Sequence, residues 1–200
     1  MFTIGFDLDL TLLDTSQRIL RASRLAFTDL GASVDDAQLL PHMGVPMEDV
    51  ARELVPGIDT VAFMRSYRHH YDTDATTPVP VLQGADDLIA AIAERGGQSV
   101  VVSAKQQAAA ELAVADAGLK VAAVVGDHFG GRKGEALRRF GRVAAYFGDH
   151  VEDARAAQVA GCPFIGVATG AYAEADLAAA GAAHTVSNLH DAIPLLDVLG

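Results

Sequence analysis

From about residue 84 onward, short apolar runs alternate with amphipathic, alanine-rich segments. This alternation predicts a parallel sheet, because parallel neighbours need a long crossover connection that is usually a helix. We expect its strands at residues 3–8, 98–102, 121–125, 143–147, 164–168 and 184–186. We expect the helices that follow them at residues 85–95, 105–117, 133–140, 151–160, 173–180 and 189–198.

The segment from about residue 15 to residue 80 interrupts this alternation. It has no comparable strand run and shows helical periodicity, which predicts helices at 16–30, 35–41, 46–55 and 59–73. Residues 72–83 contain two prolines without helical periodicity, so we interpret them as the linker back to the sheet. The pattern predicts a core domain of residues 1–14 and 81–200, interrupted by a helical domain of residues 15–80.

Composition excludes several classes of function. The chain has 15 Lys and Arg against 26 Asp and Glu, and a net charge of -11 argues against a nucleic-acid-binding surface. The single cysteine, Cys162, leaves no intrachain disulfide, CxxC redox pair or thiolate zinc cluster. No apolar run approaches the ~18 to 20 residues of a membrane-spanning helix. We therefore expect a cytoplasmic protein that binds neither nucleic acid nor membrane.

The first polar cluster is Asp7-Leu8-Asp9-Leu10-Thr11, at the end of the first expected strand. Burying a carboxylate is costly unless a cation or hydrogen-bond donors compensate. Two carboxylates in different environments can act as an ionised nucleophile or metal ligand and as a proton donor. The alternative is that these acids cap the loop into the next helix.

The second cluster, Gly148 to Asp153, follows the expected strand at 143–147. Because parallel strands end at the same edge, Asp149 and Asp153 are expected near the first cluster, and an all-oxygen ligand set favours Mg²⁺ over zinc. Alternatively, Asp149 is a helix N-cap, with Glu152 and Asp153 interacting with the helix dipole.

Two further residues end up at the same expected edge. Ser103 closes the strand at 98–102, where its hydroxyl and the free N–H groups of the next turn, such as that of Ala104, can hold an anion. Lys133 follows two glycines at the start of an expected helix and can bring a positive charge there. In the alternative interpretation Ser103 is only an N-cap and Lys133 is a solvated lysine, with Arg132 competing for its role.

Together, Asp7-x-Asp9-x-Thr11, Ser103, Lys133 and Gly148-Asp149-x-x-x-Asp153 resemble the four ordered motifs of the haloacid dehalogenase superfamily. The resemblance extends over nearly the whole chain and is closest to members with a small helical cap, such as phosphoglycolate phosphatase-like proteins. It implies the α/β fold class: a Rossmann-like parallel sheet flanked by helices, with a small α-helical cap domain inserted after the first strand. Leu10 departs from the pattern at a position often held by glycine, and His150 follows the expected metal-binding acid.

The resemblance also implies an activity, that of a phosphoric monoester hydrolase. Asp7 would attack phosphorus, Asp9 would act as general acid and base, and Thr11 would orient the loop. Ser103, Ala104 and Lys133 would bind the phosphoryl group. The expected cofactor is Mg²⁺, held by Asp7, the main-chain carbonyl of Asp9 and Asp149. Asp153 would be a further ligand or would support these ligands, and Glu152 is the alternative to Asp153.

The expected partner is a small-molecule phosphate ester, and the expected assembly is a monomer or a homodimer. Asp9 favours phosphate esters over haloacids as substrates, because a dehalogenase has no use for a general acid there. A phosphosugar mutase of the β-phosphoglucomutase type would share every motif and stays open as an alternative. Candidate contacts for the leaving group in the helical domain are Arg18, Arg21, His42, Arg52, Arg65 and Arg68. The alternative is that these are ordinary solvated side chains.

Overall fold

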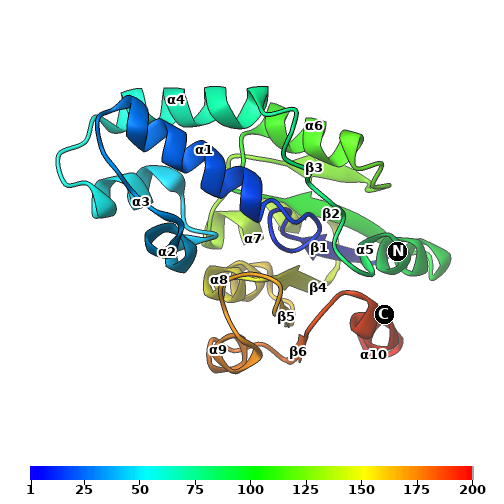
Figure 1. The fold of residues 1–200 in the computed structure, drawn as a ribbon. Helices are drawn as coiled ribbons and strands as arrows, with labels where there is room; N and C mark the ends of the chain where they lie inside the picture. Colours follow the sequence, from blue (N-terminus) through cyan, green and yellow to red (C-terminus); the bar gives the residue numbers. More distant parts are fainter. Residues whose placement is uncertain (200) are drawn as a thin grey trace. The chain divides into compact units, whose positions relative to one another are not determined.

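The computed structural model describes residues 1–199 (Figure 1). The chain divides into two compact units. One consists of Met1–Asp14 together with the chain from Pro80 onward, and the other of Thr15–Val79. The first unit contains the sheet, and the second consists of helices and their connections.

The first unit is built on a six-stranded sheet in the order β3-β2-β1-β4-β5-β6, with every neighbouring pair parallel (Figure 1). The predicted fold class, a Rossmann-like α/β sheet with a helical insertion after the first strand, is confirmed. The strands are β1 Thr3–Phe6, β2 Gln98–Val102, β3 Ala123–Val125, β4 Val143–Gly148, β5 Phe164–Val167 and β6 His184–Val186.

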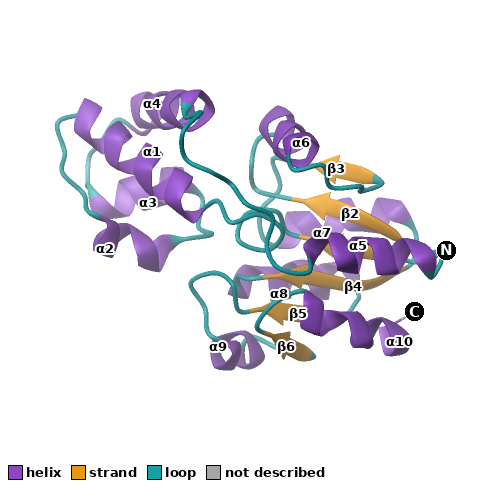
Figure 2. Ribbon diagram, turned by 45° about the vertical axis from the view of Figure 1, so that its right-hand side comes forward, coloured by secondary structure: helices purple, strands orange, loops and turns teal. Residues whose placement is uncertain are grey.

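Helices α5 and α10 cover one face of this sheet and helices α7 and α8 the other (Figure 2). The predicted helix at 189–198 begins as a 3-10 helix, where Pro194 lacks the N–H that a regular α-helix needs. The helical elements of this unit are α5 Ala85–Glu94, α6 Gln107–Asp116, α7 Gly131–Leu137, η2 Arg138–Phe140, α8 Val151–Ala160, α9 Glu174–Ala179, η3 His190–Leu195 and α10 Leu196–Leu199.

The second unit is all-helical over its described length. Its interior includes the rings of Phe27 and Phe63, whose centroids lie 4.6 Å apart. Side-chain caps start two of its helices, because Asp35 accepts from the N–H of Gln38 and Asp59 accepts from the first turn of α4. Its elements are α1 Ser16–Asp29, α2 Asp36–Leu39, η1 Leu40–His42, α3 Met47–Leu54 and α4 Thr60–Thr73.

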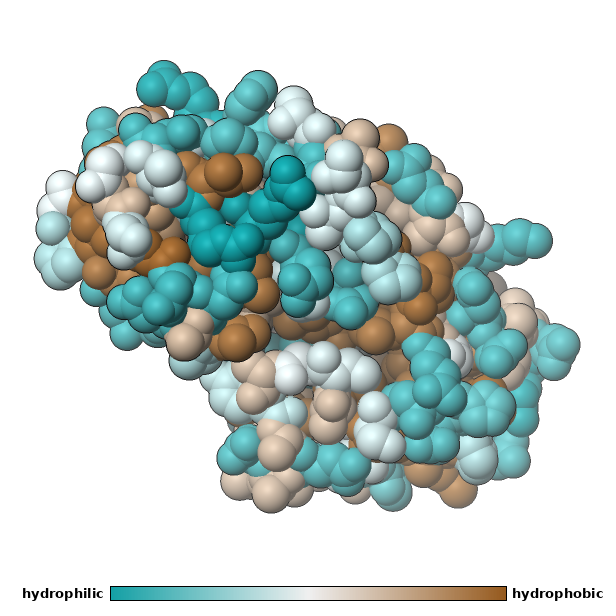
Figure 3. All heavy atoms as spheres, viewed as in Figure 1, coloured by the Kyte–Doolittle hydropathy of each residue, from teal (hydrophilic) through white to brown (hydrophobic). Residues whose placement is uncertain are grey.

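Hydrophilic side chains predominate on the face of the protein drawn in Figure 3, with smaller hydrophobic areas among them. None of the helices within residues 1–199 is long and apolar enough to cross a membrane. The large apolar side chains exposed at the surface are Met1, Leu25, Leu40, Val61, Leu112 and Val198.

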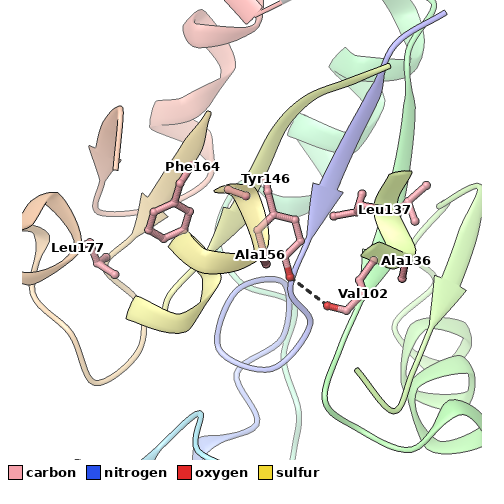
Figure 4. Close-up of a cluster of buried hydrophobic side chains, with 9 residues drawn as sticks. Val102, Ala136, Leu137, Tyr146, Ala156, Phe164 and Leu177 are labelled. Carbon is pink, nitrogen blue, oxygen red and sulfur yellow. Dashed lines mark hydrogen bonds between the residues drawn. The ribbon is translucent and has the colours of Figure 1, made fainter. Parts of the chain in front are cut away.

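The core on the α7 and α8 side of the sheet is apolar around one polar atom (Figure 4). Tyr146 of β4 is fully buried there between Leu137 of α7 and Ala156 of α8. Its hydroxyl donates to the backbone carbonyl of Val102 at 3.0 Å, so the buried polar group is satisfied. This packing anchors α7 and α8, whose first turns lie at the carboxyl edge of the sheet.

The strand order reverses between β1 and β4. The chain proceeds from β1 outward to β2 and β3, and then returns to place β4 on the other side of β1. In open α/β sheets ligands bind beyond the carboxyl ends of the strands at such a switch point, because the two connections diverge there. The two acidic clusters of the sequence follow these two strands.

Candidate active site

Three aspartates lie together beyond the switch point. Asp7 follows β1, Asp149 follows β4, and Asp153 belongs to the first turn of α8. One carboxylate oxygen of each lies within 4.8 Å of the others, and all three side chains are buried. The structure thus brings the two acidic clusters of the sequence into one site.

The loop after β1 is a tight turn that ends the strand earlier than residue 8. The carbonyl of Leu8 accepts from the backbone N–H of Leu12 at 3.0 Å, and Leu10 has a left-handed φ of +61°. This conformation costs a non-glycine residue roughly 1–2 kcal/mol, which burial of the Leu10 side chain offsets. The turn leaves Asp7 at the sheet edge, where its Oδ1 accepts the N–H of Leu8 at 2.7 Å.

One oxygen of Asp149 is satisfied and the other is not. The side-chain hydroxyl of Thr11 donates to Oδ1 at 2.9 Å. Oδ2 is buried and has no hydrogen-bond partner among residues 1–199. Gly170, in the loop after β5, packs so closely that a Cβ there would lie 1.9 Å from Oδ2. Asp149 can therefore hold its position only because residue 170 has no side chain.

Lys133 supplies positive charge beside these acids. Its Nζ lies 2.9 Å from Oδ2 of Asp7 and 2.8 Å from Oδ1 of Asp153. Lys133 is only 3% exposed, whereas Arg132 is exposed, so the interpretation of Lys133 as a solvated lysine is wrong.

The N-terminus of α8 is capped by His150. Its Nδ1 accepts the N–H of Glu152 at 3.0 Å, and the backbone N–H of His150 donates to Oδ2 of Asp153 at 3.2 Å. The interpretation of Asp149 as the N-cap is therefore wrong, and its carboxylate is left to the acidic cluster. Burial lowers the pKa of His150 below its ordinary value, which keeps the capping ring neutral.

Burial and repulsion between carboxylates disfavour the ionised forms of Asp7 and Asp149. Burial raises the pKa of Asp7 to about 7, against the opposing attraction of Lys133. Burial, and then repulsion from Asp7 and Asp153, raises the pKa of Asp149 well above its ordinary value. Burial lowers the pKa of Lys133, but the carboxylates of Asp153 and Asp7 outweigh it and raise that pKa well above its ordinary value. One ammonium does not balance three carboxylates.

Ser103 follows β2 with a buried side chain. The interpretation of Ser103 as a helix N-cap is wrong, because α6 begins only at Gln107, two residues later than predicted. Its hydroxyl oxygen instead accepts the backbone N–H of Lys105 at 3.1 Å. Ala104, between these two residues, is exposed at the same edge.

The donor set fits a divalent cation. Three carboxylates meet, and one of their buried oxygens has no hydrogen-bond partner among residues 1–199. Burial, and then repulsion between the carboxylates, raises the pKa values of two of the acids, Asp7 and Asp149. Oxygen ligands of this kind are typical of Mg²⁺ and not of zinc, which favours nitrogen and sulfur. Of the two acids left open by the sequence, the cluster contains Asp153 and not Glu152.

Most of the polar residues singled out in the helical unit are already engaged within that unit. Arg65 and Arg68 lie exposed on α4 and remain predictions. The engaged residues are Arg18 with Thr77 and Tyr71, Arg21 with Asp74, His42 with Glu53, and Arg52 with Glu48 and Asp49.

Three residues at this edge were not found from the sequence. Lys105 approaches Asp9, with 3.1 Å between its Nζ and the Oδ1 of Asp9. Thr169 donates through its hydroxyl to the carbonyl of Leu10, and Gly170 packs against Asp149. The sequence contained a signal for them, because Lys105 lies two residues after Ser103 and Thr169-Gly170 follow the expected strand at 164–168.

The chain matches the family model of the haloacid dehalogenase-like hydrolases over residues 4–167. This match includes most of the chain, so the protein belongs to that family, and the resemblance seen in the motifs is confirmed. The fold and the family define it as a hydrolase. No curated protein sequence matches it.

Solved structures with the same fold are distant in sequence. A predicted phosphatase from Clostridium acetobutylicum has a TM-score of 0.87 at 19% identity, with 98% of each chain covered. A haloacid dehalogenase-like family hydrolase from Streptococcus pneumoniae has the same TM-score of 0.87, 19% identity and 98% coverage of each chain. A predicted phosphoglycolate phosphatase from Haemophilus somnus 129pt has a TM-score of 0.84 at 16% identity, with 97% of each chain covered.

Proposed function

We propose that this protein is a Mg²⁺-dependent phosphatase that hydrolyses a small phosphorylated metabolite through an aspartyl-phosphate intermediate, as phosphoglycolate phosphatase-like enzymes do. The observation that carries the proposal is the meeting of Asp7, Asp149 and Asp153 with the Lys133 ammonium at one sheet edge. Such a site offers a nucleophile, a place for a cation and a fixed positive charge for the phosphoryl oxygens.

In the first step a carboxylate oxygen of Asp7 attacks phosphorus and the ester bond to the leaving group breaks. Asp9 gives its proton to the departing oxygen. In the second step Asp9 takes a proton from the water that attacks the phosphoaspartate, which releases phosphate and restores Asp7. The phosphoryl oxygens are bound by the hydroxyl of Ser103, the backbone N–H of Ala104 and the ammonium of Lys133.

The metal would be held by Asp7, the main-chain carbonyl of Asp9 and Asp149. Asp153 would stabilise this site without contacting the metal, because its two oxygens already accept hydrogen bonds from Lys133 and from the N–H of His150. When bound, Mg²⁺ would stabilise the negative charge of the transferring phosphoryl group. Thr11 orients Asp149 through its hydrogen bond to Oδ1.

The helical unit Thr15–Val79 would act as the cap domain that contacts the leaving group. It is inserted directly after the nucleophile loop, and it carries the exposed cations Arg65 and Arg68. Cations of this kind would favour a leaving group that carries its own negative charge.

The test is to isolate the covalent intermediate. Wild-type protein should release inorganic phosphate from an aryl phosphate, and EDTA should abolish the release. After brief reaction with an activated aryl phosphate, mass spectrometry should find a phosphoryl adduct on Asp7, none in Asp7→Asn, and an accumulated adduct in Asp9→Asn. An adduct on Asp9, or undiminished turnover in excess EDTA, would overturn the proposal. Phosphate transferred to a second hydroxyl of a sugar phosphate, without release, would indicate a mutase.

A further inference from the structure

Lys105 is held in place at the edge of the site by its own backbone. Its N–H donates to the hydroxyl oxygen of Ser103 at 3.1 Å, and its carbonyl accepts the N–H of Asp127 at 2.8 Å. The side chain is only 11% exposed. A lysine fixed at its backbone and mostly buried along its stem loses little further freedom when its ammonium makes a contact.

That contact is with Asp9. Nζ of Lys105 lies 3.1 Å from Oδ1 of Asp9, whose side chain is 21% exposed. The contact is an ion pair without the alignment of a hydrogen bond, since the buried Oδ1 has no hydrogen-bond partner among residues 1–199. The ammonium of Lys105 therefore provides the charge that faces this oxygen.

The two lysines of the site contact different acids. Lys133 lies against Asp7 and Asp153, and Lys105 lies against Asp9. Asp9 is not one of the three clustered carboxylates. Without Lys105 the ion pair that fixes this conformation of Asp9 is lost, and an aspartate side chain rotates easily between a few staggered conformers.

We propose that Lys105 is a positioning residue that holds the Asp9 side chain apart from the nucleophile, in the conformation from which it serves the leaving group. The inference rests on the proposed function, in which Asp9 is the general acid. Lys105 thus acts through Asp9, and its effect depends on how much help the leaving group needs.

Lys105→Met tests this with two substrates, because methionine keeps much of the stem and removes the charge. Ethyl phosphate has a poor leaving group that needs a proton, whereas 2,4-dinitrophenyl phosphate has a good one that does not. We expect kcat/KM for ethyl phosphate to fall about 10- to 100-fold, a part of the ~10² to 10⁴ that general acid catalysis contributes. The pre-steady-state burst of dinitrophenolate, which reports only the attack by Asp7, should change less than about 3-fold.

Three controls make the outcome specific. Lys105→Arg keeps the charge and should restore most of the ethyl phosphate activity, and Lys120→Met removes an exposed lysine of the same unit and should change nothing. In an Asp9→Asn background, Lys105→Met should cost less than about 2-fold, because residues that act as a unit are not additive. Thermal melts confirm that each variant is folded; if Lys105→Met is not, Lys105→Gln takes its place.

Two kinds of failure are distinguishable. If wild-type protein forms phosphoaspartate at Asp7 but Lys105→Met slows both substrates equally, or costs as much in Asp9→Asn as in wild type, Lys105 does not act through Asp9 and the inference is overturned. If wild-type protein gives no burst and no adduct on Asp7, the proposed function fails and the inference with it.

Discussion

The side-chain hydroxyl of Thr11 donates a hydrogen bond to Oδ1 of Asp149 at 2.9 Å and so joins the loop after β1 to the loop after β4. The bond leaves Oδ2 of Asp149 as the free, buried oxygen of the acidic cluster. A ligand held by such a neighbour keeps its orientation when the metal leaves, which reduces what must be ordered on binding.

Thr11→Val should therefore weaken Mg²⁺ binding by about 10-fold or more while the fold persists. Valine has nearly the same shape as threonine but cannot donate to Asp149. Isothermal titration with Mg²⁺ measures the affinity. Thr3→Val is the matched control, because Thr3 is equally buried and donates to the carbonyl of Phe140 at 2.7 Å, away from the acids. Equal Mg²⁺ affinity in Thr11→Val and wild type would contradict the role given to Thr11.

The stability of the metal-free protein should fall as the pH rises through the acidic range. The folded-state pKa values of Asp7 and Asp149 are raised, so the folded protein holds protons that the unfolded chain has released. The loss should extend from near the ordinary carboxyl value of 3.8 to about 7, the raised pKa of Asp7. Mg²⁺ should restore more stability at about pH 7.5 than at about pH 5, because protons compete with it at the lower pH.

Melting temperatures in EDTA and in Mg²⁺, recorded for wild type and Asp149→Asn, measure this effect. The difference between the two proteins removes the contribution of acids elsewhere, such as Asp29 and Asp74, whose pKa values are lowered. The pH dependence should be weaker in Asp149→Asn. The same slope in both proteins would show that Asp149 does not titrate as the structure indicates.

Gly170→Ala should damage the metal site without a large effect on the sheet. The new Cβ would lie 1.9 Å from Oδ2 of Asp149, so the carboxylate must move. We expect Mg²⁺ affinity and phosphatase activity to fall about 10-fold or more. Gly131→Ala is the control, because its Cβ would meet Val159 at an ordinary 3.4 Å. If Gly170→Ala bound Mg²⁺ normally, the loop after β5 would have moved to relieve the clash, and the close packing of Gly170 would not be required.

At position 10, the glycine variant should be more stable than the alanine variant, which is the reverse of the usual order. Both Leu10→Ala and Leu10→Gly lose the buried side chain, but only glycine relieves the strain of the φ of +61°. The strain of roughly 1–2 kcal/mol exceeds the ~0.4–1 kcal/mol that glycine costs through the unfolded chain, so Leu10→Gly should be the more stable by about 0.5–1 kcal/mol. At Leu12, fully buried in the same loop and without a positive φ, alanine should be the more stable. Urea denaturation of the four variants measures their free energies of unfolding. If Leu10→Ala were more stable than Leu10→Gly, the result would contradict the backbone strain at Leu10.

The regular elements were predictable where their signals are local. The helix expected at 151–160 is α8 Val151–Ala160, whose end is marked by Gly161 with a left-handed φ of +76°. The strands expected at 98–102 and 184–186 are β2 and β6 at the same residues. Predicted boundaries were wrong near Pro194, which lacks the N–H that an α-helix needs, and near Leu10, where the chain turns sharply after β1.

The sequence by itself determined that acids, a hydroxyl and a lysine follow successive strands of a parallel sheet, because strand periodicity and chain order are both readable from local patterns. It did not determine which of two neighbouring residues faces the site, as with Lys133 beside Arg132 or Asp153 beside Glu152. Adjacent helical positions point in directions about 100° apart, so the choice depends on which side of the helix the distant strands bury. Contacts such as Thr11 with Asp149 and Lys105 with Asp9 likewise exist only in the tertiary structure, because the sheet order that brings β1 beside β2 and β4 places these residues together.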